Sequence, residues 1–281
     1  MWFIQFLNGL SYSLLLFLVS VGLALSMGVM RIVNLAHGSY FLLGGYVGYS
    51  IARLTGNFFV AALGGATSTL IFGLFMEHYF LRHLYAKHLE QLLCTFGFVY
   101  VIMALTKFVW GGNVLVIQKP AILLGSVDMF GFSFPIYRVA IIAVGLIIAI
   151  CLWWLLGKTR IGIAIRAVVE DDKMAAAIGI NARTTVIASF GLGLLLAGLA
   201  GVLGGPILGL YPGLDLEILM LAIVIVVVGG GTLEGAFLGS LLIGFASIFG
   251  MIFLGERSLF VAFGIMAIVL LLRPQGLLGR L

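Results

Sequence analysis

Long apolar runs recur along the whole chain and are separated by short polar or glycine-rich interruptions. A membrane-spanning helix needs about 20 consecutive apolar residues, whereas a transmembrane β-barrel would show alternating segments of roughly ten residues. We therefore predict an all-α, polytopic transmembrane bundle of about eight to ten membrane segments, some of them discontinuous helices. The candidate spans are 6–29, 36–53, 57–80, 92–111, 136–156, 184–209, 216–230, 235–254 and 258–272.

The composition supports a membrane protein without a separate soluble domain. Hydrophobic residues make up 63% of the 281 positions and charged residues only 9%, too few to cover a soluble domain of this size. The longest hydrophilic stretch is 157–183, so we expect a single domain over residues 1–281. The first apolar run lacks a basic segment before it and is expected to be a retained span rather than a signal peptide.

Lysine and arginine are distributed unequally between the two ends of the expected spans, and this predicts the orientation. The side with more basic residues would hold the 157–183 loop and the C-terminus in the cytoplasm, and the 112–135 loop would be external. The first side carries Arg31, Arg82, Lys87, Lys158, Arg160, Arg166, Lys173, Arg183, Arg273 and Arg280, and the second carries Arg53, Lys107, Lys119, Arg138 and Arg257.

The stretch "MRIVNLAHGSY", residues 30–40, places polar residues between two apolar runs. Asn34 is expected to cap the helix that follows, because its side chain can accept a hydrogen bond from that helix's first turn. A helix N-terminus at membrane depth presents free N–H groups and partial positive charge, as in many substrate sites of transporters. Asn34, His37 and Gly38 are therefore candidates for a translocation path; the alternative is an ordinary turn between two spans.

A second interruption lies in "VVVGGGTLEGAFLGSLLIG", residues 226–244. Its glycines Gly229, Gly230 and Gly231 are further candidates for the path. Glu234 is expected at the start of the next helix and in contact with water, although a role inside the bundle is the alternative. The similarity of this break to the one at 31–38 suggests two related halves.

Small residues recur at four-residue spacing and predict close contacts between helices. Such contacts serve packing alone, or packing together with the sliding that a transporter needs. The pairs and ladders are Gly44 with Gly48, then Gly193, Ala197, Gly201 and Gly205, and finally Gly231, Gly235 and Gly239.

The third notable stretch is "GKTRIGIAIRAVVEDDKMAAAIGIN", residues 157–181. Asp171 or Asp172 can cap a short helix through "KMAAAIG", and Gly179 can end it. A short helix with a compact apolar face on the cytoplasmic side is typical of an element that docks in a partner's groove. The alternative is a solvated loop that only connects two spans.

Residues that could do chemistry are sparse. The sequence offers no cluster with metal-ligand spacing and no pairing of nucleophile and base, so we expect no enzyme, no cofactor and no metal. His78, His83 and His88 are spaced by five and are interpreted as interfacial. An ion-coupled carrier would need carboxylates within the membrane, and the candidates Glu77 and Glu234 both lie near span ends.

Together, these stretches resemble the permease subunits of branched-chain amino acid ABC importers, of the shorter-permease type. The resemblance rests on "GLALSMGVMRIVNLAHGSYFLLGGYVGY" (22–49), "RIGIAIRAVVEDDKMAAAIGIN" (160–181), "VVVGGGTLEGAFLGSLLIGF" (226–245) and "LLRPQGLLG" (271–279), in order along nearly the whole chain. It implies a multi-pass protein of a bacterial or archaeal inner membrane. The implied partners are a second homologous permease, two cytoplasmic ATPases and an external substrate-binding protein.

The resemblance also assigns expected roles to residues. Thr95 and Gly97, in "LLCTFGFVY", match a threonine–glycine feature of the family and join the candidates for the path. The implied substrates are leucine, isoleucine and valine, with urea, short amides and aromatic carboxylates as alternatives within the family. An ion-coupled secondary carrier and a membrane scaffold without transport are the alternatives from other classes. The residues expected to dock the ATPase are Glu170, Asp171, Ala175, Ala176, Ala177, Ile178 and Gly179.

Overall fold

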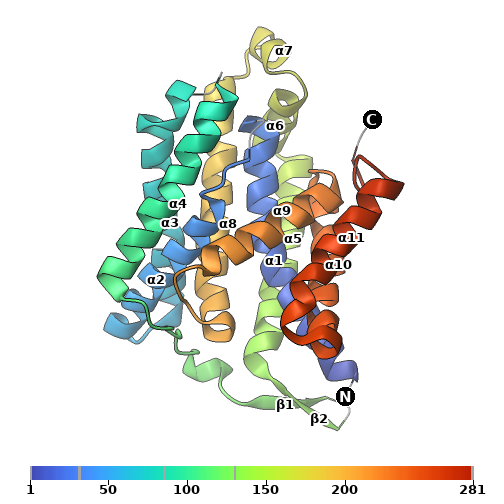
Figure 1. The fold of residues 1–281 in the computed structure, drawn as a ribbon. Coiled ribbons are helices and arrows are strands. Elements are labelled where there is room, and N and C mark those ends of the chain that lie inside the picture. The colour runs from blue at the N-terminus through green and yellow to red at the C-terminus, as the bar shows by residue number, and fades with distance from the viewer. Residues whose placement is uncertain (1, 31–32, 85–86, 130, 280–281) are drawn as a thin grey trace.

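The computed structural model describes residues 2–30, 33–84, 87–129 and 131–279, and it confirms the all-α prediction (Figure 1). One antiparallel hairpin, β1 (Ser126–Met129) with β2 (Phe132–Pro135), accounts for the named strands in these ranges. The short 3₁₀ helices are η1 (Leu81–Leu84), η2 (Ala121–Leu123) and η3 (Gly255–Arg257). The α-helices are α1 (Trp2–Met30), α2 (His37–Thr55), α3 (Phe58–Tyr79), α4 (His88–Trp110), α5 (Ile136–Lys158), α6 (Arg160–Glu170), α7 (Asp172–Ala177), α8 (Ala182–Leu208), α9 (Leu214–Gly229), α10 (Leu233–Leu254) and α11 (Ser258–Leu272).

Each of the nine candidate spans corresponds to a helix, namely α1 to α5 and α8 to α11. Within the described residues, six helices are long and apolar enough to cross a membrane: α1, α3, α4, α5, α8 and α10. The helices α9 and α11 are shorter, with 16 and 15 residues. These features support a multi-pass membrane protein in which some segments are shorter than a full span.

Helices α1 and α8 form the centre of the bundle. About 78% of the most apolar part of α1 and 67% of that of α8 are buried, against 22–33% in the other four long helices. The outer helices therefore leave large apolar side chains exposed, as lipid contact requires, while α1 and α8 are enclosed by protein on most sides.

Glycines bring the two central helices into backbone contact. A Cβ atom added to Gly22 of α1 would lie 2.7 Å from the carbonyl oxygen of Gly193 in α8, and one added to Gly193 would lie 2.6 Å from that of Gly22. Gly44 of α2 likewise faces the backbone of Gly198, and a Cβ on Gly201 would overlap the carbonyl oxygen of Phe41. The prediction that small residues mediate close helix contacts is confirmed.

The reciprocal contact at Gly22 and Gly193 is the centre of two related halves of opposite orientation. In each half a long helix (α1 or α8) is followed by a short break and then by a helix that begins inside the bundle (α2 or α9). Each of these helices ends at a glycine with positive φ, Gly56 (66°) or Gly230 (81°). A polar residue, Asn57 or Thr232, then caps the next helix through its side chain. Figure 1 shows α1 and α8 side by side, running in opposite directions.

This arrangement corrects one expectation. The glycine turn at 229–231 is the counterpart of the α2–α3 turn around Gly56, not of the break at 31–38. The true counterpart of that break is the segment between α8 and α9, residues 209–213, "GLYPG". The breaks at 229–231 and 31–38 resemble each other in sequence because both interrupt apolar runs. The first is a turn at the end of α9, whereas the second leads into the start of α2 inside the bundle.

The two ends of the bundle carry different elements (Figure 1). The β1–β2 hairpin and η2 lie at the end where α4 stops and α5 starts, and α6 and α7 lie at the opposite end, between α5 and α8. The segment 157–183, expected to be a loop with one short helix, therefore contains two helices. Glu170 belongs to α6 and not to the shorter α7.

Candidate functional site

Helices α2 and α9 begin against the middle of the bundle rather than at its surface. His37, the first residue of α2, lies with its Nε2 atom 3.0 Å from the carbonyl oxygen of Val19 in α1. Gly38 packs so tightly that a Cβ there would overlap the carbonyl oxygen of Asp215 and lie 2.8 Å from Cβ of Leu219 in α9. The N-termini of α2 and α9 therefore meet within the protein.

Five polar residues gather at this junction, and we call Asn34, His37, Ser39, Thr95 and Asp215 the half-helix cluster. The Ser39 hydroxyl of α2 donates a hydrogen bond of 2.8 Å to Oδ2 of Asp215 in α9. Thr95 of α4 accepts from the backbone N–H of the residue after Asn34 over 3.4 Å. The structure thus places Thr95 beside the break before α2 that contains Asn34 and precedes His37 and Gly38.

The half-helix cluster is closed to solvent in this conformation. Each of its five side chains is 3% exposed or less. Within the part of the chain that the structure describes, Nδ2 of Asn34, Nδ1 of His37 and Oδ1 of Asp215 are buried without a hydrogen-bond partner. Buried polar groups are costly when they are left unpaired.

Asn34 is not the N-cap that the sequence suggested. The residue before α2 is Ala36, which makes no side-chain cap. Oδ1 of Asn34 instead accepts a hydrogen bond of 3.1 Å from the N–H of Ala36, and its carbonyl oxygen accepts from the N–H of His37. The chain therefore makes a turn at residues 34–37, just before α2, and Asn34 stabilises this turn rather than capping the helix.

The remaining candidates for the path lie elsewhere. Gly97 is exposed on α4, and a Cβ added there would meet nothing within 4 Å. The glycines at 229–231 form the α9–α10 turn, where Gly230 packs against Gly279 and Gly276 of the C-terminal segment. Backbone N–H groups of Leu277 and Leu278 donate to the carbonyl oxygens at the end of α9. In this chain these glycines make a compact turn that the C-terminal segment covers.

The predicted short helix around residue 175 is confirmed as α7. Asp171 caps it, since its side chain accepts hydrogen bonds from the N–H groups of Lys173 (2.9 Å) and Met174 (3.0 Å). Gly179 ends it with a φ of 88°. Ala176, Ala177 and Gly179 are exposed, and the Ile178 side chain is 70% exposed, which leaves an exposed apolar patch. Ala175 is only 2% exposed and packs inward instead.

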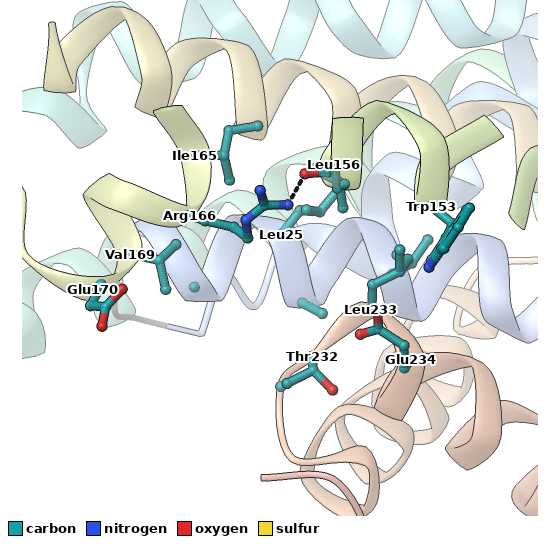
Figure 2. A pocket seen from close by; sticks show the side chains of 15 residues that line it. Leu25, Trp153, Leu156, Ile165, Arg166, Val169, Glu170, Thr232, Leu233 and Glu234 are labelled. Atoms are coloured by element: carbon teal, nitrogen blue, oxygen red, sulfur yellow. Dashed lines mark hydrogen bonds between the residues drawn. The ribbon is translucent and has the colours of Figure 1, made fainter. Parts of the chain in front are cut away.

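Helix α6 links this patch to the bundle and was not anticipated. Gly162, Ile165 and Val168 form its buried face. The Arg166 guanidinium donates to the carbonyl oxygen of Leu156 at the end of α5 (Figure 2). A cavity of about 730 Å³ separates α6 from the start of α10, and Arg166, Glu170 and Glu234 are its charged lining residues. Glu234, as expected, is exposed in the first turn of α10.

Asp215 is the site residue that sequence reasoning missed. It was placed in a loop between the candidate spans 184–209 and 216–230, yet it is 1% exposed and faces α2. The available signal was "LYPGLD", residues 210–215, a proline–glycine break with a carboxylate between two apolar runs. Glu77 is the other deeply buried carboxylate among the described residues, at 3% exposure in the last turn of α3.

The chain was compared with known families and proteins. The family model described as "Branched-chain amino acid transport system / permease component" matches residues 5–271. The chain belongs to this family. The predicted resemblance is therefore confirmed over nearly the whole sequence, including the half-helix cluster and the α6–α7 segment.

Relatives span both bacteria and archaea. The high-affinity branched-chain amino acid transport system permease protein BraD of Pseudomonas aeruginosa is 29% identical, over 98% of this chain and 95% of its own length. The corresponding permease protein LivH of Escherichia coli is 28% identical over the same shares. A probable branched-chain amino acid transport permease LivH of Methanocaldococcus jannaschii is 29% identical, over 95% and 90%.

A solved structure shares the fold. PsaBC from Streptococcus pneumoniae, determined in complex with a Fab, aligns with a TM-score of 0.57 and 16% identity. The alignment covers 95% of this chain and 91% of that chain. At this identity the likeness concerns the architecture of the bundle only.

Proposed function

We propose that this chain is the transmembrane permease subunit of an ATP-binding-cassette importer for the branched-chain amino acids leucine, isoleucine and valine. Residues 1–281 form one permease domain in a bacterial or archaeal inner membrane, with the C-terminus in the cytoplasm. The chain supplies half of the translocation path, and a second homologous permease supplies the other half. Two cytoplasmic ATPases provide energy, and an external binding protein delivers the substrate.

The observation that carries this proposal is the full-length match to the permease family and to relatives named as branched-chain amino acid permeases. The match covers about 98% of this chain and 95% of two of these relatives. A self-sufficient ion-coupled carrier would have no use for an exposed docking element such as the α6–α7 segment.

The exposed patch of α7 is the proposed contact with an ATPase. Ala176, Ala177 and Ile178 present apolar surface at one end of the bundle, and Gly179 turns the chain back toward α8. Helix α6 transmits movement because it joins α7 and contacts α1: a Cβ on Gly28 would lie 3.5 Å from Val169. The cavity beside α6 gives it room to shift relative to the start of α10 (Figure 2).

The half-helix cluster is the proposed part of the path that this chain contributes. It combines two helix N-termini, a buried carboxylate and three buried polar atoms without partners. Helix N-termini that point at a carboxylate-bearing substrate are favourable in transporters. Rearrangement of α2 against α9 would open the cluster, and the glycine contacts at Gly22 and Gly38 permit such sliding because they carry no side chain.

Uptake of radiolabelled leucine tests the proposal, in cells that carry the neighbouring transport genes. The variant Ile178→Glu places a charge on the α7 patch, and we expect ATPase co-purification and uptake each to fall by at least about tenfold, equivalent to 1.4 kcal/mol of binding. The matched control is Ile122→Glu, at an isoleucine 79% exposed at the opposite end of the bundle, with ATPase co-purification as its readout. Equal membrane levels of both variants are required.

The possible outcomes separate the parts of the proposal. Loss of co-purification with Ile178→Glu alone supports ATPase docking at α7. Retained co-purification and uptake would refute that assignment. Absence of leucine uptake with the unaltered chain would reject this substrate and direct the assay to urea, short amides and aromatic carboxylates. Leucine uptake by the chain without ATPases would favour an ion-coupled carrier.

A further inference from the structure

A second cavity, of about 780 Å³, lies at the same end of the bundle as α6 and α7. Basic residues from separate segments line it: Arg82 and His83 from η1, His88 from the start of α4 and Arg183 from the start of α8. We call this the basic cavity. One acidic residue, Asp172 of α7, also lines it. Basic residues that lie far apart in the sequence therefore line one open cavity.

The charges in the basic cavity do not balance. The guanidinium groups of Arg82 and Arg183 are permanently positive, and Asp172 supplies a single negative charge. The cavity therefore has a net positive charge even when both imidazoles are neutral. A space of this kind favours an anion, and guanidinium groups match the oxygens of phosphate in particular.

Arg82 contacts two histidines near the ends of α3 and η1. Its Nε donates to Nε2 of His83 over 3.4 Å, and its Nη1 lies 3.5 Å from Nδ1 of His78. A guanidinium has five N–H donors in a fixed planar array, so these two contacts leave donors for a ligand.

The basic cavity lies near the ends of several membrane-length helices. It lies where three membrane-length helices begin or end, since α3 stops just before η1 and α4 and α8 start at His88 and Ala182. Its other walls are apolar and include Met30 at the end of α1, Val168 of α6 and Val186 of α8. Basic pockets between membrane helices at this level suit anionic lipid headgroups, whose acyl chains continue along apolar helix surfaces.

We propose that the basic cavity binds a phosphate group, supplied by an acidic phospholipid, with Arg82 and Arg183 as its main contacts. The bound headgroup ties the α3–α4 connection to the start of α8 and to α7. Lipid would in this way stabilise the segment that carries the docking helix. Free inorganic phosphate has the same recognition chemistry and is the alternative source.

Native mass spectrometry of the full-length chain, purified in mild detergent from cells, tests this proposal. Phosphatidylglycerol is the lipid probe. We expect the fraction of protein that retains it to fall by at least about tenfold in the double variant Arg82→Gln and Arg183→Gln, because basic groups near an anionic headgroup each contribute to its binding. The matched control is Arg257→Gln, at an exposed arginine of η3 at the other end of the bundle.

Two further measurements keep the result interpretable. Size-exclusion profiles establish that the double variant is folded, and single variants replace it if it is not. Titration of delipidated protein with inorganic phosphate, followed by thermal stability, identifies the source of the phosphate. Stabilisation by free phosphate together with unchanged phosphatidylglycerol retention would assign the cavity to the soluble anion. Unchanged lipid retention without any response to phosphate would overturn the proposal, whatever the uptake activity of the chain.

Discussion

At the scale of single residues, Asp215 shows how a membrane bundle holds a buried carboxylate. Its Oδ2 atom accepts a hydrogen bond from Ser39, and its place in the first turn of α9 lets the positive helix end offset its charge. The other carboxylate oxygen has no hydrogen-bond partner among the residues that the structure describes. A charge held by so few contacts depends strongly on each of them.

The first prediction follows from this dependence. Replacing Ser39 by alanine removes the hydrogen bond to Asp215, and we expect a loss of about 1.5–3 kcal/mol of stability, the value of a hydrogen bond to a charged group. Adding Asp215→Asn to the Ser39→Ala chain should recover part of the loss, since a neutral amide costs less to bury than a charge. The measurement is the thermal-unfolding midpoint in detergent, followed by size-exclusion chromatography.

A matched control exists for this prediction. Ser247→Ala removes a hydroxyl that donates to the carbonyl oxygen of Ile243 within its own helix, over 2.8 Å, and it should leave the midpoint nearly unchanged. Equal effects of Ser39→Ala and Ser247→Ala would mean that Asp215 does not rely on Ser39.

The sequence identified part of this site and missed another part for physical reasons. His37 and Gly38 were found because they interrupt an apolar run. Thr95 joined them only through the family resemblance, since nothing local to α4 indicates that it meets the break. Asp215 was missed because a carboxylate beside a proline–glycine pair looks the same in a surface loop and in a break between helices inside the bundle. Only the packing of α2 against α9 distinguishes the two.

At the scale of elements, α6 and α7 show what local pattern can and cannot predict. The cap, the alanine run and the final glycine of α7 are local signals, and the sequence predicted each of them. Helix α6 has only 11 residues, with arginines at its start and in its middle, so it does not stand out beside long membrane spans. Its buried residues Gly162, Ile165 and Val168 recur at three-residue spacing, which is the local signal that could have predicted an amphipathic helix.

The second prediction concerns the cap of α7. A six-residue helix is too short to be stable alone, so its hydrogen bonds to Asp171 matter more than they would in a long helix. Asp171→Ala should cost about 1 kcal/mol locally. We expect faster amide hydrogen exchange over 172–178 and weaker ATPase co-purification, with little change in the midpoint of global unfolding.

The conservative variant Asp171→Asn provides the comparison, because asparagine caps helices about as well as aspartate. It should exchange at nearly the original rate. Fast exchange in both variants would mean that the charge of Asp171, rather than its hydrogen bonds to Lys173 and Met174, holds α7 in place.

At the scale of the whole molecule, the two inverted halves share their order of long helix, break, shorter helix and capped turn. Gly22 and Gly193 lie where the central helices touch, and Gly56 and Gly230 lie where positive φ ends the shorter helices. These correspondences are visible only in the structure, because single glycines separated by long apolar runs do not make a recognisable sequence repeat.

The inverted arrangement also separates the basic residues. The α6–α7 end carries Lys158, Arg160 and Lys173, and the hairpin end carries Lys119 and Arg138, as the count of basic residues anticipated. Cytoplasmic ends of membrane helices are enriched in such residues. The expected orientation therefore places α7 in the cytoplasm and η2 outside.

The third prediction tests that orientation with membrane-impermeant thiol reagents. In a chain with Cys94 and Cys151 replaced by alanine, Ile122→Cys should be labelled in intact spheroplasts, and Ile178→Cys should be labelled only after the membrane is opened or inverted. Both isoleucines are at least 70% exposed, so a difference in labelling reports the side of the membrane rather than burial. The reverse result would place α7 outside, where no ATPase could reach it, and would refute the docking role of the α6–α7 segment. Labelling of both positions from the same side would mean that the chain crosses the membrane an even number of times between residues 122 and 178. The bundle has one long helix in this interval, α5, so this outcome would contradict α5 as a single membrane crossing.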